Sequence, residues 1–271
     1  MRKFVVAAIV AAVAIAGFSV VANAGKGEGG TSFDLTLKPK KVNRPAGMTV
    51  VFEPTKIDDQ GTADTSDDVY TPTDENTIKL PRKASVDTRG APRCKKTPTE
   101  VGRGENCANK TKVGEGSTLS FVGGQPIEGG DKRQGGVPLR GTMEIFNTKG
   151  DLILVVTTCQ PGTGPETGQD CVPAGQRVVL TGEWSNVTRR PTLTVETPTA
   201  LHQSGVVIVR LEIVVDRHTK RVKVKGREVL RSLFLTPETC RGRWTSQVHT
   251  DFTDGSEQTI KDRQKCRKPA N

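Results

Sequence analysis

Residues 206–215 read VVIVRLEIVV, and this stretch decides the fold class of the chain. Every second residue from Val207 to Val215 is aliphatic, whereas Arg210 and Glu212 fall on the opposite side of the alternation. A period of two is typical of a β-strand with one face in a core and the other toward solvent. The stretch therefore predicts a strand with one unbroken apolar face, made of Val207, Val209, Leu211, Ile213 and Val215.

The same alternation recurs in short segments on both sides of this strand. Asp254-Gly255 separates the last two of them, and Asp-Gly is a strong signal for a two-residue hairpin turn. The chain holds 29 Gly and 16 Pro, which favours many turns, and its strands do not alternate with long helical patterns. We therefore predict an all-β fold, an antiparallel β-sandwich of about a dozen strands with disulfide-clipped loops. The expected strands cover 33–37, 48–52, 77–80, 83–88, 137–147, 152–158, 177–184, 191–195, 206–215, 220–225, 229–235, 243–252 and 256–264.

Two segments depart from the strand pattern. Residues 54–76 are acidic, polar and without periodicity, which predicts a long surface loop. Residues 97–100 fit a capping box, in which Thr97 caps a helix, Pro98 opens it and Glu100 completes the box. A short helical turn is expected there.

The N-terminus has the three parts of a secretory signal peptide. Arg2 and Lys3 form a basic start, an apolar run follows, and Ala22-Asn23-Ala24 offers small residues to a signal peptidase. An apolar run of about 18 residues can also just span a bilayer, so an uncleaved anchor is the alternative. We predict a signal peptide over 1–24, Sec-type export, a flexible spacer over 25–31 and a single β-rich domain over 32–271, with a possible subdivision near 116–136. The protein is expected to be secreted or associated with the cell wall.

All cysteines lie after the predicted cleavage site. An even number of cysteines in an exported protein indicates disulfides, and the six fall into three couples that are local in sequence. A metal site is the alternative, but no C-x-x-C spacing is present and the chain holds only three His. We predict the pairs Cys94–Cys107, Cys159–Cys171 and Cys240–Cys266, and no metal or other cofactor.

A series of short features runs along the chain in a fixed order. After the signal peptide and an early strand pair, Cys107 is followed by Val113-Gly114-Glu115-Gly116, and Phe146-Asn147 stands at a hairpin turn. A closing unit from Thr236 to Cys266 holds a Trp and the Asp-Gly turn. In this order the chain resembles uncharacterised secreted, Cys-paired, β-rich proteins of high-GC Gram-positive bacteria. The resemblance implies an extracellular location and β structure, and it implies no activity.

No motif of a known catalytic class is present in the sequence. G-x-S-x-G, S-x-x-K and H-E-x-x-H are all absent. His249 and Asp251 share a strand face with Thr245, but any β-hairpin produces such an arrangement by chance, and solvated side chains are the preferred interpretation. Glycoside hydrolysis needs two facing carboxylates that no sequence pattern selects. We predict no catalytic residues, with a secreted hydrolase that has an unmarked carboxylate site as the alternative.

The segment from Asp58 to Asp68 is rich in aspartate around a glycine, as extracellular calcium loops are. Lys56 and Gln60, however, stand where two Asp ligands of that pattern are expected. We therefore predict a solvated acidic loop that does not bind calcium.

The formal net charge is +10, and residues 200–271 hold 15 Lys and Arg against 8 Asp and Glu. A basic stripe in this part, formed by Arg217, Arg221, Lys223, Lys225 and Arg227, is a candidate site for a polyanion. Charge that protects an open strand edge from aggregation is the alternative, and the one we favour. Export makes a cell-wall or extracellular polyanion the expected class of partner, and excludes chromosomal nucleic acid as an ordinary one. The sequence thus predicts a non-enzymatic binding or structural protein of the cell envelope or extracellular space.

Overall fold

The computed structural model describes residues 25–27, 29–58, 67–127, 132–165 and 167–268. The predicted signal peptide and residues 59–66 of the acidic loop lie outside these residues. Within them, no helix is long and apolar enough to cross a membrane.

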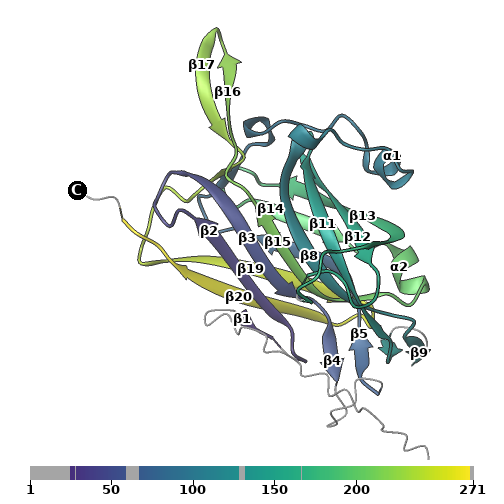
Figure 1. Ribbon diagram of the computed structural model, residues 1–271. Coiled ribbons are helices and arrows are strands. Elements are labelled where there is room, and N and C mark those ends of the chain that lie inside the picture. The colour runs from purple at the N-terminus through teal and green to yellow at the C-terminus, as the bar shows by residue number, and fades with distance from the viewer. Residues whose placement is uncertain (1–24, 28, 59–66, 128–131, 166, 269–271) are drawn as a thin grey trace, which may run out of the picture.

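One antiparallel sheet of 14 strands forms the body of the molecule (Figure 1). Its main path, in spatial order, is β1 (Gly25–Lys26), β2 (Ser32–Lys38), β3 (Pro45–Glu53), β15 (Val207–Val215), β8 (Lys112–Val122), β11 (Val137–Asn147), β12 (Asp151–Cys159), β13 (Pro173–Ser185), β14 (Thr192–Glu196), β6 (Thr73–Lys79), β19 (Arg243–Phe252) and β20 (Glu257–Lys265). The short strand β18 (Phe234–Leu235) joins this path by pairing with β3 and with β7 (Ser85–Val86).

Two small sheets and four short helices complete the described part. One sheet has the order β4 (Lys56–Asp58), β5 (Val69–Thr71), β10 (Lys132–Gln134) and β9 (Gln125–Ile127). The other is a two-stranded ribbon of β16 (Thr219–Val224) and β17 (Arg227–Ser232), which projects from the top of the molecule in Figure 1. The helices are α1 (Pro98–Gly102), α2 (Thr199–Gln203) and the 3₁₀ turns η1 (Thr88–Gly90) and η2 (Asn109–Thr111).

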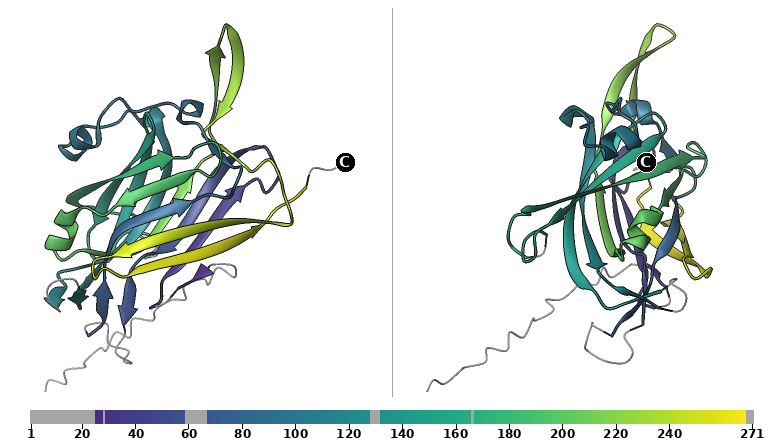
Figure 2. Two further views of the ribbon diagram at one scale, coloured as in Figure 1. Left: turned by 180° about the vertical axis from the view of Figure 1, so that it is seen from behind. Right: turned by 90° about the vertical axis from the view of Figure 1, so that its right-hand side faces the viewer.

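The large sheet curls until its two halves face each other across one main core (Figure 2). That core joins residues of both halves, among them Leu35, Val50, Ile145, Leu154 and Val248. The predicted all-β antiparallel fold is therefore confirmed, and the three disulfides form as predicted, with Cα–Cα distances of 5.3, 5.1 and 5.9 Å. The structure adds that the two layers of the sandwich belong to one continuous sheet.

Side chains of β20, the last strand of the path, nearly close the sheet by bonding to β2. The amide of Leu35 in β2 donates to Asp262 in β20 at 3.2 Å, and the amide of Leu37 donates to Gln264 at 2.9 Å. Gln264 in turn donates its side-chain amide to the carbonyl of Leu37 at 2.8 Å. The partner numbers rise together, so β2 and β20 run parallel. Buried polar side chains on β20 thus satisfy backbone groups that an open edge would leave to water.

The prediction that residues 206–215 form one unbroken apolar face is wrong at the N-terminal end of the strand. A β-bulge between Ile208 and Arg210 shifts the register of β15 against β8. Val207 and the bulge residue Val209 pack outside the sheet with Tyr70, whereas Ile213 and Val215 pack in the main core. One extra residue reverses which side of the sheet each later side chain faces, because the period of a strand is two.

Two expectations about irregular segments need revision. Residues 54–76 are not one long loop, because β4, β5 and the start of β6 lie within them. β5 pairs with the preceding strand β4 on one side and with β10, which is distant in sequence, on the other, and local periodicity does not reveal the second pairing. Gly25, expected in a flexible spacer, pairs with Phe33, and a Cβ there would lie 2.3 Å from the carbonyl oxygen of Lys261. Glycine at this position permits close packing rather than flexibility.

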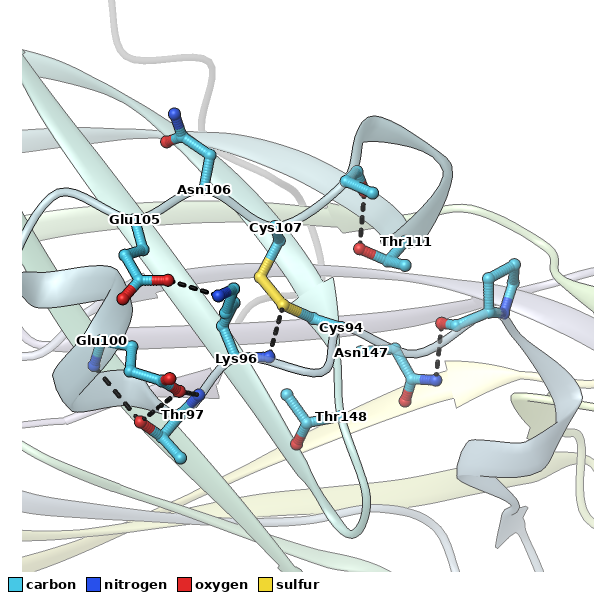
Figure 3. Close-up of a disulfide and its surroundings, with 12 residues drawn as sticks. Cys94, Lys96, Thr97, Glu100, Glu105, Asn106, Cys107, Thr111, Asn147 and Thr148 are labelled. Carbon is cyan, nitrogen blue, oxygen red and sulfur yellow. Dashed lines mark hydrogen bonds and ion pairs between the residues drawn. A yellow bond between two sulfur atoms is a disulfide. The ribbon is translucent and has the colours of Figure 1, made fainter.

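The first disulfide loop covers the outer face of β11, β12 and β13 (Figure 3). Cys94, Cys107 and Val101 pack on Ile153 and Val155 there, and form a second small core. The predicted capping box is confirmed in α1, where Thr97 and Glu100 cap each other's backbone amides. Buried Asn147 donates to the carbonyls of Thr88 and Pro92 at 2.8 and 3.0 Å, which fixes the segment before Cys94. This cover explains why residues 152–156 are buried on both faces.

Candidate functional site

The basic stripe predicted from the sequence lies on the projecting ribbon and does not form one surface. Arg221 and Lys223 lie on one face of the ribbon, opposite Leu230 and Glu228, whereas Arg227 pairs with Val224 on the other face. Arg221 is 78% exposed and forms an ion pair with Glu228 at 3.5 Å. Lys225 stands at the turn, and Arg217 precedes β16, both exposed. The five predicted residues therefore give scattered, solvated charge.

A denser group of cations lies elsewhere, on the outer face of β19 and β20. There a cleft of about 580 Å³ is lined by residues from four separate segments of the chain. None of the described residues that line it is Asp or Glu. We call this site the cationic cleft. Its cations are Arg82, Lys83, Arg190, Arg241, Arg243, Lys261 and Arg263.

Two loops that dock against each other supply one wall of the cleft. The turn at Arg82 and Lys83 is fixed by backbone hydrogen bonds from Leu80 to Pro191 at 2.8 Å and from Lys83 to Arg189 at 2.7 Å. Arg190 extends from this junction and donates to the side chain of Gln247 in β19 at 2.8 Å. The backbone pairing thus brings Arg82 and Arg190 together although they are distant in sequence.

The third disulfide supplies the other wall. Cys240–Cys266 ties the loop before β19 to the end of β20, and the amide of Cys266 donates to the carbonyl of Gly242 at 3.2 Å. The buried indole of Trp244 donates to the carbonyl of Thr239 at 3.0 Å and anchors the same loop. Arg241 and Arg243 are thereby held beside the cations of β20.

The cleft carries uncompensated positive charge. Within the part of the chain that the structure describes, none of its seven Lys and Arg forms an ion pair with a carboxylate. The Nε atom of Arg190 is buried and has no hydrogen-bond partner. Burial, and then the neighbouring charge of Arg82, lower the pKa of Arg190. Like charges held together at a partly buried site favour the binding of an anion, because an anion relieves their mutual repulsion.

The opposite end of the same strands carries acidic groups. His249 Nε2 lies 3.2 Å from Asp251 and 3.6 Å from Glu257, and His249 Nδ1 lies 2.9 Å from the hydroxyl of Thr259. The three ionisable groups could hold a metal ion. His249 already contacts both carboxylates on an exposed face, so we assign no metal to them. The triad-like arrangement that the sequence allows does not form, because these groups rather than Thr245 are the partners of His249.

A pair of facing carboxylates, which the hydrolase alternative requires, is found on the outer face of β8 and β11. Glu115 and Glu144 are direct cross-strand neighbours beside a shallow groove. Lys112 lies between them, with Nζ 3.5 Å from Glu115 and 3.3 Å from Glu144. The two carboxylates are 74% and 51% exposed. Ion-paired, solvated carboxylates of this kind are typical of a surface network rather than of an acid–base pair.

The acidic segment is described only at its ends. Asp68 is buried and accepts a hydrogen bond from the hydroxyl of Tyr70 at 3.1 Å. Burial first, and then Asp68, raise the pKa of Tyr70. Asp68 is therefore engaged in packing the small sheet. The prediction that the acidic loop does not bind calcium concerns mainly residues 59–66, which lie outside the described part.

Sequence reasoning missed the cationic cleft because its members are far apart in the chain. The prediction followed the longest local run of charge, which is the ribbon. The usable signal was weaker: on β19 and β20 the outward positions Arg243, Lys261 and Arg263 are basic. The contribution of Arg82 and Arg190 depends on the docking of loops, which only the tertiary structure shows.

Fold and site together define a disulfide-bonded, all-β protein with a cationic cleft on its outer face. Three disulfides are consistent with an extracellular protein. No protein-family model matches the chain, and no curated protein is similar to it. The resemblance to secreted proteins of high-GC Gram-positive bacteria stays a prediction.

Proposed function

We propose that the protein is a non-enzymatic extracellular protein that binds an anionic polymer in the cationic cleft. The single observation that supports this function is the set of seven Lys and Arg around one cleft, with no carboxylate among the residues that line it. Export through the Sec route, with cleavage after Ala24, is part of the proposal. A polymer of the cell wall or the extracellular space, with phosphate, sulfate or carboxylate groups, is the proposed class of partner.

The physical argument rests on charge density. Each cation that contacts a polyanion releases condensed counterions, so affinity falls steeply with salt. The cleft concentrates such contacts at one place, whereas the ribbon spreads its cations over two faces and a turn. A rigid cleft also loses less side-chain entropy on binding than the tip of a projecting ribbon, because Arg190 is already held by Gln247.

The test measures binding of heparin, as a general polyanion probe, over a range of sodium chloride concentrations. The triple variant Arg82→Gln, Arg190→Gln, Arg263→Gln should bind more weakly at low salt. Its slope of log affinity against log salt should be shallower by about one unit for each lost contact. Because Arg190 is partly buried, a second triple variant, Arg241→Gln, Arg243→Gln, Lys261→Gln, changes only exposed residues of the cleft and should show the same effect.

A matched control removes the same charge from the ribbon. The variant Arg221→Gln, Lys223→Gln, Lys225→Gln should keep most of the affinity and the slope of the unchanged protein. If this variant loses binding while both cleft variants keep it, the site lies on the ribbon and the proposal is wrong. If all three variants bind equally, the cleft has no specific role, which also contradicts the proposal.

A further inference from the structure

A second concave site lies inside the fold, away from the cationic cleft. On the inner face of β8, β11, β12, β13 and β15, beside α2, a cavity of about 390 Å³ is present. Most of its lining is aliphatic, including Val122, Leu139, Val156, Leu180, Leu201 and Ile208. A cavity of this size and character is typical of sites for small molecules.

Two buried hydroxyls interrupt the aliphatic lining. Thr118 is 6% and Ser120 is 9% exposed, and both line the cavity from β8. Among the residues that the structure describes, neither hydroxyl has a hydrogen-bond partner. Neither hydroxyl oxygen is fully enclosed by protein atoms, so both open onto the cavity and can form a hydrogen bond there. Their positions two residues apart on one strand place both groups on the same side, where one polar group of a ligand can contact them.

A glycine keeps the space beside these hydroxyls open. Gly141 in β11 is the cross-strand partner of Thr118, and a Cβ at this position would lie 2.7 Å from Thr118 Oγ1 and 3.2 Å from Val156 Cγ1. Glycine inside a strand weakens the strand and often marks a close approach of a ligand or of another backbone. Here a side chain at 141 would fill the space next to Thr118.

The remaining polar groups of the lining narrow the class of ligand. Arg140 and Arg177 are the only charged residues among the described residues that line the cavity, and both are cationic. The Nε atom of Arg140 is buried without a partner, and Arg177 donates to Asn106 at 3.1 Å. A cationic ligand is therefore disfavoured, and a neutral or acidic head group fits.

We propose that this inner cavity binds a small aliphatic molecule whose polar head is a carboxylic acid or an alcohol. The aliphatic side chains surround its chain, and Thr118 and Ser120 hydrogen-bond its head. α2 closes one side of the cavity, since Leu201 lines it and His202 Nε2 holds the helix to the carbonyl of Thr73 in β6 at 3.1 Å. The inference is independent of the cationic cleft.

The test is titration calorimetry of the purified protein with octanoic acid and with 1-octanol, and with octyltrimethylammonium as a probe of the wrong charge. Saturable binding of one equivalent of the acid or the alcohol is expected, and the preferred probe identifies the head group. No measurable binding of either, or equal binding of the ammonium compound, would overturn the proposal.

Three variants locate the site. Ser120→Leu fills the cavity and should abolish binding, and Thr118→Val removes one hydroxyl at constant shape and should weaken binding about tenfold. Thr250→Val is the matched control, since Thr250 is equally buried on β19 but does not line the cavity. It should bind like the unchanged protein, as should the cleft variant Arg241→Gln, Arg243→Gln, Lys261→Gln. Circular dichroism and the melting temperature confirm that each variant folds. Wild-type affinity in a folded Ser120→Leu variant would contradict the assignment.

Discussion

Asp262 shows at the scale of one residue how the sheet approaches closure. Its carboxylate is 2% exposed and accepts the amide of Leu35, but its Oδ1 atom has no partner. Burial raises the pKa of Asp262, and the charge of Asp34 nearby acts in the same direction, although the amide of Leu35 lowers it. The side chain is thus needed as an acceptor and disfavoured as a charge.

The substitution Asp262→Asn tests this balance through pH. A raised pKa in the folded state means that the folded protein binds more protons than the unfolded chain between the two pKa values. The stability of the unchanged protein should therefore fall as pH rises from about 4, the ordinary range of Asp, through the raised pKa. Asn does not ionise, so the melting temperature of the variant relative to the unchanged protein should increase with pH.

The control for this measurement is the exposed Asp216. Asp216→Asn makes the same chemical change at a position where the side chain remains in water. A difference between Asp262→Asn and the unchanged protein that is constant with pH would contradict the raised pKa.

Among the elements of the fold, the three disulfide loops have different structural roles. The loop of Cys94–Cys107 covers an apolar face and holds Val101 on Ile153 and Val155. The loop of Cys159–Cys171 is polar, and most of its described residues are half-buried or exposed. The loop of Cys240–Cys266 holds two arginines of the cationic cleft.

Removal of the disulfides in pairs should separate these roles. Loop-closure entropy predicts a loss of about 3 kcal/mol for either of the two short loops. Cys94→Ala with Cys107→Ala should cost about 1 kcal/mol more than Cys159→Ala with Cys171→Ala, because the small core also loosens. Urea unfolding measures both values. Equal losses would show that the cover over β12 adds no stability.

The ribbon of β16 and β17 is an element whose edges have no strand partners in the described part of the chain. Val229 and Leu230 are 40% and 61% exposed there, and its base is held by an ion pair between Arg231 and Asp87. Open edges with exposed aliphatic residues associate with other strands unless charge prevents it.

The variant Arg221→Gln, Lys223→Gln, Lys225→Gln should therefore self-associate. We expect a concentration-dependent increase in mass by light scattering, with a melting temperature close to that of the unchanged protein. As the control, the second cleft variant, Arg241→Gln, Arg243→Gln, Lys261→Gln, removes the same charge and should stay at its original mass. If the ribbon variant keeps the same mass as the unchanged protein at all concentrations, these cations do not protect the edges of the ribbon.

At the scale of the whole molecule, one sheet connects nearly every strand. β12 lies within it and is covered on both sides over residues 152–156, whereas the ribbon is attached only at its base. Stability within a fold follows this distribution of buried contacts.

Native-state hydrogen exchange should reflect this arrangement. The amides of residues 143–146 and 152–156 should exchange slowest, near the free energy of global unfolding, and those of residues 220–230 fastest. Thermal unfolding should show one cooperative transition, as the predicted single domain over 32–271 requires. Two resolved transitions would favour a division of the chain near 116–136.

Features that are local in the chain were predictable from the amino-acid sequence. Strand periodicity defined most strands, Asp254-Gly255 defined the last hairpin, and short spacings paired the six cysteines. These signals are readable because each depends on neighbours within about 25 residues, through side-chain alternation or loop closure.

Features that join residues distant in sequence emerge only when the whole chain is folded. The bulge in β15 reversed the faces of Val207 and Val209, and Asp262 became buried because it meets Leu35 across the nearly closed sheet. The cationic cleft and the inner cavity arise in the same way, from Arg82 beside Arg190 and from β8 beside β11 and β15. Periodicity records which side of a strand a residue faces, but not which strand or loop lies there, and that choice is made by packing of the whole chain.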